Sequence, residues 1–141
     1  MLTDSEILRR HQRGQSFRFV PSADWRATLG LRANVMVAGP KRALDAFLEA
    51  ATPELREPVK SAHGTLPPLL DGMHTLILTD VDRLDDAEQR RLRQWFEERR
   101  NTDVQVVSLT SIPLFSLVSE NAFDTELYYR LNTIFLEVQS I

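Results

Sequence analysis

The chain contains no cysteine, which excludes disulfide bonds and thiolate metal sites and is typical of proteins in a reducing compartment. It also lacks an apolar run near the roughly 18 residues of a membrane-spanning helix, and its first residues do not have the pattern of a signal peptide. The histidines are scattered among separate segments, so no metal site is expected. These absences lead us to expect a cytoplasmic protein with no membrane partner.

An excess of positive charge is absent as well. The 141 residues include 17 basic and 20 acidic side chains, which leave a formal net charge of -3. This balance gives no electrostatic reason for non-specific nucleic-acid binding, so we expect no direct DNA binding by this chain. What the chain does contain is ordinary for a globular protein, with 43% hydrophobic and 26% charged residues. Its length is enough for a single domain with its own core.

From residue 35 onward, strand and helix patterns alternate along the chain. Short aliphatic and β-branched runs predict buried strands, whereas apolar residues at i, i+3, i+4 and i+7 predict helices. Such alternation favours a three-layer α/β domain with a mostly parallel sheet. The predicted strands cover residues 35–38, 58–62, 75–80, 104–109 and 133–138, with 58–62 at an edge; the predicted helices cover 44–51, a segment from 85, 114–118 and 127–131. Residues 66–70, around two prolines, predict a short helix or turn.

The part before residue 35 is predicted to be an N-terminal helical arm and lead-in over 1–34, and residues 35–141 form the α/β core of a single domain. Within the arm, residues 3–15 are predicted to be helical. Residues 17–20 alternate as a short strand that stops at Pro21. A helix that ends near Gly30 then leads to the first strand of the core.

The run at 75–80 is apolar on both faces, so we expect it in the middle of the sheet. In open parallel sheets ligands collect at the carboxyl ends of the strands, where Thr79, Asp80 and Asp82 follow this run. The two aspartates also suit a role in capping the loop after the strand. Further on, Asp85 and Glu88 have the spacing of a capping box, which predicts the start of a helix.

The turn after the first core strand invites a test for a phosphate-binding loop, which needs several glycines so that backbone N–H groups surround a phosphate. The turn has one glycine, Gly39, and Pro40 removes an N–H where donors are needed. Lys41 and Arg42 could meet an anion at the N-terminus of the next helix. The alternative, which the sequence favours, is a compact turn with exposed basic side chains.

Three segments resemble one known family. Thr75–Leu84, T-L-I-L-T-D-V-D-R-L, is similar to the Walker B segment T-L-F-L-D-E-I-x-x-L of the sigma-54 interaction domain, the AAA+ ATPase module of bacterial enhancer-binding transcription activators. Gln89 and Leu92 continue that register. Val106–Leu114 resembles the sensor I strand, I-I-A-A-T-N-x-x-L, and Phe123–Asn132 resembles F-R-E-D-L-Y-Y-R-L-N. The resemblance implies a P-loop NTPase-like AAA+ core with a mostly parallel five-stranded sheet.

The same resemblance implies that the nucleotide machinery is altered. Thr79 stands where the magnesium-holding aspartate is implied, and Asp80 stands where the catalytic glutamate is implied. A threonine is a poor ligand for a hard cation, and the shorter aspartate lies too far back to orient water. Ser111 replaces the sensor I asparagine. Gly39 retains the first glycine of the phosphate loop, and the rest of that loop is missing.

The groups through which the family contacts neighbours are also reduced. Of two arginines that the family offers to the γ-phosphate of a neighbouring subunit, the first is replaced by Asp124 and the second is Arg130. Arg130 has two interpretations, a local salt bridge and an intersubunit role. Tyr128, Tyr129 and Leu131 are expected to pack the last helix under the sheet. The segment from 39 to 80 is too short for the G-A-F-T-G-A loop, and we expect no helical lid and no helix-turn-helix.

The sequence therefore predicts a short, degenerate sigma-54 interaction domain that acts as a regulatory or protein-interaction module without ATP hydrolysis. The expected partners are proteins: other AAA+ subunits, further copies of this chain or the transcription machinery. No cofactor is expected. The alternative is a weak ATP-binding or ATP-hydrolysing sigma-54-dependent regulator, and a third interpretation is a scaffold unrelated to transcription. In the ATP-binding alternative, the cofactor-binding candidates are Gly39, Lys41 and Arg42, the catalytic remnants are Asp80, Ser111 and Arg130, and the magnesium position is at Thr79 and Asp80.

Overall fold

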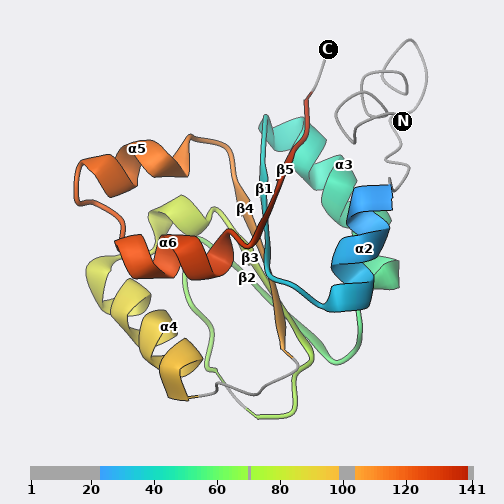
Figure 1. The fold of residues 1–141 in the computed structure, drawn as a ribbon, viewed down its shortest axis with the longest axis horizontal. Coiled ribbons are helices and arrows are strands. Elements are labelled where there is room, and N and C mark those ends of the chain that lie inside the picture. Colours follow the sequence, from blue (N-terminus) through green and yellow to red (C-terminus); the bar gives the residue numbers. More distant parts are fainter. Residues whose placement is uncertain (1–22, 70, 99–103, 140–141) are drawn as a thin grey trace.

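A five-stranded sheet forms the centre of the molecule in the structure, a computed structural model that describes residues 23–69, 71–98 and 104–139. The predicted helix at 3–15 and strand at 17–20 lie outside the described residues. The strands follow the order β2-β3-β4-β1-β5, and every pairing of neighbouring strands is parallel (Figure 1). Their bounds are β1 Val35–Ala38, β2 Val59–His63, β3 Thr75–Thr79, β4 Gln105–Thr110 and β5 Ile134–Glu137.

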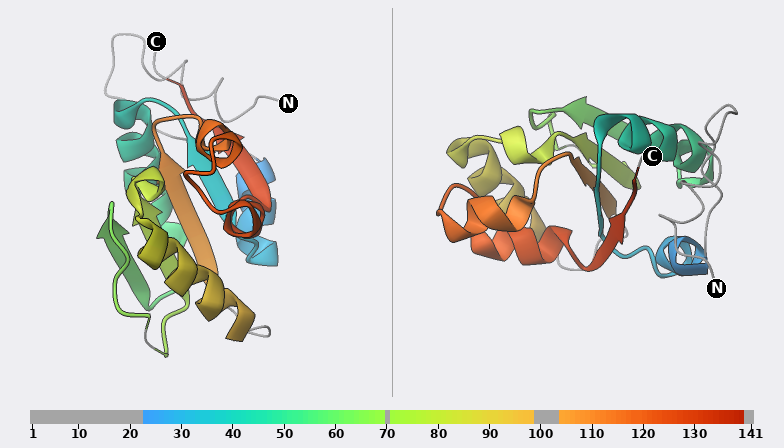
Figure 2. Two further views of the ribbon diagram at one scale, coloured as in Figure 1. Left: turned by 90° about the vertical axis from the view of Figure 1, so that its left-hand side faces the viewer. Right: turned by 90° about the horizontal axis from the view of Figure 1, so that it is seen from above.

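Helices cover both faces of this sheet, so the predicted three-layer α/β fold is confirmed (Figure 2). One face carries α2 (Ala23–Leu31) and α3 (Lys41–Ala51); the other carries α4 (Asp86–Glu98), α5 (Leu114–Ser119) and α6 (Thr125–Leu131). Two short 3-10 turns, Thr52–Glu54 and Val81–Arg83, complete the elements. The described part of the chain holds no helical lid, and none of its helices is both long and apolar enough to cross a membrane.

The strands direct alternate side chains into two separate cores, because successive side chains point to opposite faces of a sheet. Val35 and Val37 join the core under α2 and α3, whereas Met36 joins the core under α4, α5 and α6. In the first core the rings of Trp25 and Phe47 meet edge to face with centroids 5.2 Å apart. Burying such large apolar side chains is worth about 1.5–3 kcal/mol each, so these contacts fix both helices on the sheet.

Strand order differs from the sequence-based expectation in one respect. β3 lies inside the sheet between β2 and β4, but the middle position of the five belongs to β4. All six residues of β4 are buried, whereas Thr79 at the end of β3 is half-buried. β2 is an edge strand, as predicted.

The prediction of a helix or turn at residues 66–70 is wrong for the described residues 66–69, which have no regular structure. Side chains of α4 bond both backbone groups of Leu66. The carboxylate of Glu88 accepts the N–H of Leu66 at 2.7 Å, and Arg91 donates to the Leu66 carbonyl oxygen at 3.0 Å. Pro67 and Pro68 cannot donate to a helix in any case. The segment is therefore held against α4 without regular structure.

The helix predicted to end near Gly30 ends at Leu31, as expected, and Arg32 after it is left-handed, with φ 54°. An expectation about the last helix is corrected. Tyr129 does not pack under the sheet, because 61% of it is exposed, whereas Leu131 is fully buried and Tyr128 is half-buried as expected. The tertiary neighbours of each position decide these details.

Candidate functional site

The carboxyl ends of β1, β3 and β4 lie at one edge of the sheet, and a pocket of about 330 Å³ opens there beside the start of α3. Four residues singled out from the sequence line this pocket together: Lys41, Thr79, Asp80 and Ser111. Gly39 lines a neighbouring groove of about 380 Å³, which also includes Ser111. Segments far apart in the sequence are thus brought to the edge where ligands of open α/β sheets collect.

The hydroxyl of Thr79 already has partners on the adjacent edge strand. It donates to the carbonyl oxygen of Ala62 at 3.2 Å and is paired with Nδ1 of His63. Because the hydroxyl proton goes to Ala62, the imidazole nitrogen is the donor in the second bond. His63 lies opposite Thr79 in the parallel register of β2 and β3. The side chain at the implied magnesium position is therefore held by β2.

Asp80 turns the chain sharply away from β3. Its backbone is left-handed, with φ 53° and ψ 47°, a conformation that aspartate tolerates better than most residues. The side chain makes no hydrogen bond to the following turn, so the capping role expected of it is wrong. Asp82 instead accepts the hydroxyl of Thr110 at 3.1 Å and joins the ends of β3 and β4.

The turn at Gly39 and Pro40 provides no free backbone donor at either residue. The Gly39 N–H donates to the carbonyl oxygen of Thr110 at 3.2 Å, and proline has no N–H. A Cβ added at Gly39 would lie 2.0 Å from the carbonyl oxygen of Val138, far inside the contact limit. The glycine is thus required by the close approach of the chain after β5, whatever its role in phosphate binding.

The electrostatics of the pocket are mixed. Lys41 contributes one positive charge, and the carboxylates of Asp45 and Asp80 contribute two negative charges, so these three side chains together carry a formal charge of −1. A triphosphate would meet like charges here unless a cation accompanied it. Favouring an anion, α3 begins at Lys41 with no side-chain cap and no acidic residue in its first turn. Arg42, the other basic candidate, is exposed and lines neither pocket.

Arg130 lies away from this pocket, on α6. Its guanidinium carbon is 5.9 Å from the centroid of the Phe96 ring, a cation–π contact. Its carbonyl oxygen accepts Nδ2 of Asn34 at 3.0 Å. The local contact of the Arg130 side chain is therefore with an aromatic ring.

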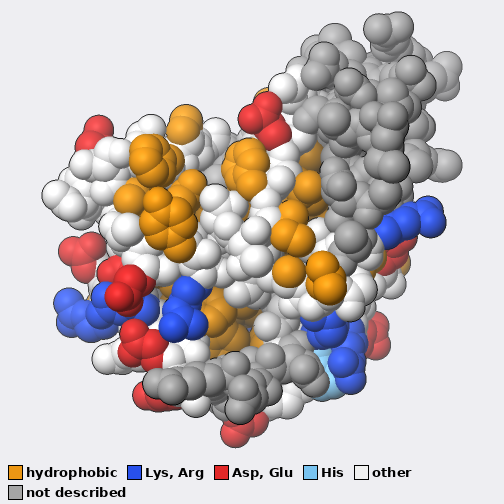
Figure 3. Space-filling model, viewed as in Figure 1, with side chains coloured by type: hydrophobic (Ala, Val, Ile, Leu, Met, Phe, Trp, Pro, Cys, Tyr) orange, Lys and Arg blue, Asp and Glu red, His pale blue; other side chains and the backbone are white. Residues whose placement is uncertain are grey.

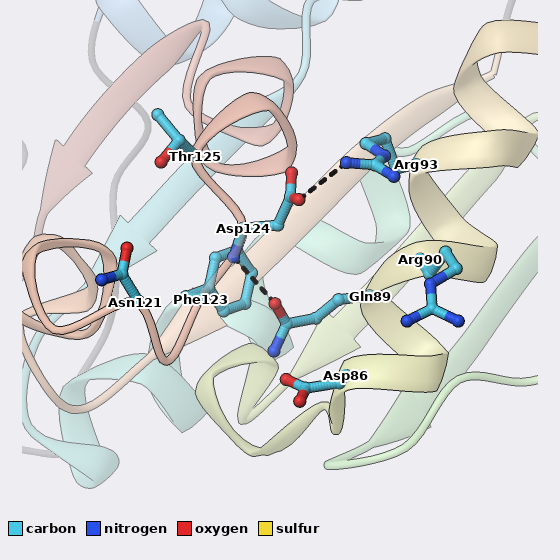
Figure 4. Close-up of a pocket in the computed structure, with 8 residues that line it drawn as sticks. All are labelled: Asp86, Gln89, Arg90, Arg93, Asn121, Phe123, Asp124 and Thr125. Carbon is cyan, nitrogen blue, oxygen red and sulfur yellow. Dashed lines mark hydrogen bonds and ion pairs between the residues drawn. The ribbon is translucent and has the colours of Figure 1, made fainter.

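Asp124 is fixed by three interactions in a third pocket, of about 440 Å³, between α4 and the segment that leads into α6 (Figure 4). One carboxylate oxygen is 2.9 Å from Nη1 of Arg93, and the other accepts the N–H of Leu127 at 2.8 Å, which caps α6. The Asp124 N–H donates to Oε1 of Gln89 at 2.8 Å. Asp124, which stands where the resemblance implies an arginine, thus has a structural role.

His63 and Asp45 also line the pocket, although no sequence pattern predicted them there. His63 belongs to a strand whose register is set only by its pairing with β3, so no local pattern connects it to Thr79. Asp45 lies on the polar face of the amphipathic helix α3, one turn after Lys41, where a charged residue is ordinary. The i, i+4 spacing of Lys41 and Asp45 on α3 is the signal that could have predicted Asp45 at this site.

The strand order, the helices on both faces and the pocket at the carboxyl edge define a P-loop NTPase-like α/β domain of the AAA+ type. Solved structures with this fold include NtrX from Brucella abortus in complex with ADP, at 18% identity and a TM-score of 0.66 over 86% of this chain and 37% of that chain. The structure of NtrX from Brucella abortus in complex with ATP has 16% identity and a TM-score of 0.63, over 84% of this chain and 36% of that chain. A further structure of NtrX from Brucella abortus has 17% identity and a TM-score of 0.60, over 84% of this chain and 36% of that chain. The chain spans little more than a third of NtrX, and the likeness shows the fold.

The chain belongs to the sigma-54 interaction domain family, whose model matches residues 54–141. The family resemblance drawn from Thr75–Leu84 and Phe123–Asn132 is thereby confirmed. The match begins after the Gly39–Pro40 turn and includes β3, β4 and β5. No curated protein matches the chain. Family and fold together support a regulator related to sigma-54-dependent transcription.

Proposed function

We propose that this domain acts as a regulatory or protein-interaction module in sigma-54-related transcription regulation and does not hydrolyse ATP. The observation that carries the proposal is the state of Thr79. At the position implied for the magnesium ligand there is a hydroxyl, not a carboxylate, and it is already bonded to Ala62 and His63. A hard cation prefers carboxylate oxygens, so the site offers it little.

Two further features support the same proposal independently. The turn at Gly39 has its N–H bonded to Thr110 and is followed by a proline, so neither of these two residues offers a donor to a phosphate. Asp124 occupies one of the arginine positions and is tied to Arg93. Phosphoryl transfer depends on positioned cations and donors more than on covalent chemistry, so each loss removes a needed group.

The proposed partners are proteins: further AAA+ subunits, copies of this chain or components of the transcription machinery. The expected cytoplasmic location belongs to the same proposal, because bacterial transcription takes place there. The net charge of -3 supports contact through protein partners and not through DNA.

The test is an equilibrium titration of the purified chain with a fluorescent ATP analogue in the presence of magnesium, combined with a phosphate-release assay. We expect a dissociation constant weaker than about 1 mM and no turnover above background. Micromolar binding accompanied by hydrolysis would overturn the proposal.

A second candidate function is weak nucleotide binding, which the shared pocket of Lys41, Asp80 and Ser111 favours. Lys41→Ala discriminates between the two candidates, because only the second requires this ammonium group at the start of α3. Arg42→Ala is the matched control, since Arg42 is an exposed neighbour that does not line the pocket. Loss of nucleotide affinity in the first variant alone would favour the second candidate.

A further inference from the structure

The two borders of the sheet differ in how well they are protected against further strand pairing. Within the described ranges the sheet ends at β2 on one side and at β5 on the other. An edge strand offers backbone N–H and C=O groups to another strand, and proteins discourage such pairing with prolines and lysines. β2 follows Pro58 and includes Lys60. β5 has neither feature and begins with three apolar residues, Ile134, Phe135 and Leu136, so it is the edge suited to accept a strand.

Phe135 presents both its backbone and its side chain at this edge. The N–H groups of Ile134 and Val138 donate to carbonyl oxygens on the β1 side, at 3.0 and 2.9 Å. Because backbone groups of successive residues in a strand point to opposite sides, those of Phe135 point away from β1. Leu136 belongs to the core under α2 and α3, so the Phe135 side chain lies on the opposite face, where it is 50% exposed. Figure 3 shows hydrophobic side chains at the surface over α5, α6 and β5.

We infer that residues 17–20 of this chain, Phe-Arg-Phe-Val, form a sixth strand that pairs in parallel with the open edge of β5. In this strand Phe17 and Phe19 point to one face of the sheet, beside Phe135, and cover its exposed ring. Aromatic side chains on one face of neighbouring strands stabilise their pairing. The sixth strand goes beyond the proposed function and does not rest on it, because it involves neither a nucleotide nor a partner protein.

The position of α2 suits a strand at this edge. α2 ends at the amino edge of the sheet, since Nε2 of Gln105, the first residue of β4, donates to the carbonyl oxygen of Ala33 at 2.8 Å. The start of α2 therefore lies toward the carboxyl edge (Figure 1). A strand parallel to β5 ends at that same edge, so Pro21 and Ser22 are enough to connect it to α2. Strand-to-helix connections usually have about two to six residues, and serine is a preferred residue just before a helix.

The topology of the sheet supports the same pairing independently. The chain passes from β1 through α3 to β2 on the face that also carries α2, and so moves toward the β2 edge. A strand outside β5 that leads through α2 to β1 moves in the same direction over the same face. The two crossovers therefore have the same hand, as the strong preference for right-handed parallel crossovers requires.

A second copy of this chain could use the same edge in two ways. One is β5 against β5 about a two-fold axis, and the other is β5 against β2 of the next copy, head to tail. Residues 17–20 are favoured over both because two residues tie them to α2. A short connection gives an effective concentration on the order of 1 mM, whereas a second copy at micromolar concentration must first lose its translational and rotational freedom. The head-to-tail arrangement also meets Pro58 and Lys60 at β2.

Amide hydrogen exchange and nuclear Overhauser effects, measured by NMR on the full chain, test the pairing directly. We expect the Phe135 N–H to be protected from exchange, because it donates to the sixth strand, and we expect Overhauser effects between Phe135 and residues 17–20. Phe17→Ser combined with Phe19→Ser should make the Phe135 N–H exchange at least about tenfold faster. The N–H of Val37, in the interior strand β1, should stay protected, which would show that the sheet is intact.

Ile7→Ser combined with Leu8→Ser is the matched control. It makes the same kind of change, two apolar residues to serine, in the same N-terminal part of the chain but outside residues 17–20. We expect this variant to keep the protection of the Phe135 N–H. The two measurements on the parent chain decide the pairing even if a variant does not fold.

Three results would overturn the sixth strand. The first is a Phe135 N–H that exchanges in the parent chain as fast as an unpaired amide. The second is protection that survives the Phe17→Ser, Phe19→Ser substitution. The third is protection that falls on dilution, or Overhauser effects between labelled and unlabelled copies in a mixed sample, either of which would assign the edge to a second copy. The samples contain no nucleotide, so the result is independent of the ATP titration.

Discussion

Gly39 and Val138 approach so closely that a Cβ on the glycine would lie 2.0 Å from the valine carbonyl oxygen and 2.9 Å from one of its methyl groups. The contact holds the chain after β5 against the end of β1, where the Val138 N–H donates to the carbonyl oxygen of Ala38 at 2.9 Å. A glycine that resembles a remnant of a phosphate loop is therefore required here by packing.

Gly39→Ala is expected to destabilise the chain by about 2–3 kcal/mol, because a backbone oxygen cannot move aside as a flexible side chain can. Urea unfolding followed by circular dichroism measures the change. Gly30→Ala is the control: no atom lies within 4 Å of a Cβ there, and alanine in a helix should gain about 0.5–1 kcal/mol. A neutral Gly39→Ala would contradict the packing explanation and leave ligand binding as the reason for the glycine.

Glu88 connects the start of α4 to Thr65 and Leu66, in the segment between β2 and β3. Its carboxylate accepts the Thr65 hydroxyl at 2.6 Å, the Leu66 N–H at 2.7 Å and the Asp85 N–H at 3.1 Å. The Thr65 hydroxyl is the largest cause that lowers the pKa of Glu88 below its ordinary value, and burial opposes it. A lowered folded-state pKa means that the charged form is bound better in the folded chain than in the unfolded chain.

This pKa shift gives a stability contribution with a defined sign. It is fully present above the unfolded glutamate pKa of about 4.3 and is lost as the pH falls through the lower folded value. Glu88→Gln should therefore cost about 1 kcal/mol at pH 7, and the difference from the parent chain should shrink below about pH 4. Urea unfolding at several pH values measures it, with exposed Glu97→Gln on the same helix as control. A difference that stays constant down to pH 3 would argue against an ionic origin.

Local features of the fold could be predicted from the sequence where their causes are local. The capping box of Asp85 and Glu88 is present as its spacing predicts, with the Glu88 N–H bonded to the Asp85 carboxylate at 2.8 Å. The five strands were located within one residue at each end, because short aliphatic and β-branched runs mark them. The family motifs survive in the core: Phe123, Leu127 and Leu131 are all buried.

Features that depend on tertiary pairing could not be read in the same way. The middle position of β4 follows from strand order, which no single strand encodes. The partner of Thr79 is His63, because β2 and β3 pair in one register among several that their sequences allow. The segment at Leu66 lost its predicted helix to Glu88 and Arg91, which lie 22 and 25 residues further along the chain.

Restoring the two implied Walker B carboxylates should not restore hydrolysis. In the Thr79→Asp, Asp80→Glu double variant the Gly39 N–H remains bonded to Thr110, Pro40 still lacks an N–H, and the acidic lining of the pocket stays in place. We expect phosphate release at background level and a stability loss of about 1–2 kcal/mol from the hydrogen bonds of the Thr79 hydroxyl. Thr79→Ser keeps that hydroxyl and should lose less. Turnover by the double variant would mean that the phosphate-binding turn is still competent.

The two carboxylate oxygens of Asp124 have different partners, so substitutions at this residue can distinguish helix capping from ion pairing. Asp124→Ala removes the cap of α6 and the pair with Arg93 and should cost about 1.5–2.5 kcal/mol. Asp124→Asn keeps an N-capping side chain and loses only the charge, so we expect about 0.5 kcal/mol. Arg93→Ala should also cost about 0.5 kcal/mol, since both side chains are partly exposed, at 31% and 28%, and water screens the pair.

The arginine that the family resemblance implies at this position is expected to fit worst of all. Asp124→Arg removes the cap and places a second positive group beside Arg93, so it should cost at least about 2 kcal/mol. Urea unfolding of the four variants measures the series. If Asp124→Asn proved as costly as Asp124→Ala, the ion pair and not the cap would hold this loop, and a partner able to compete for Arg93 could release it.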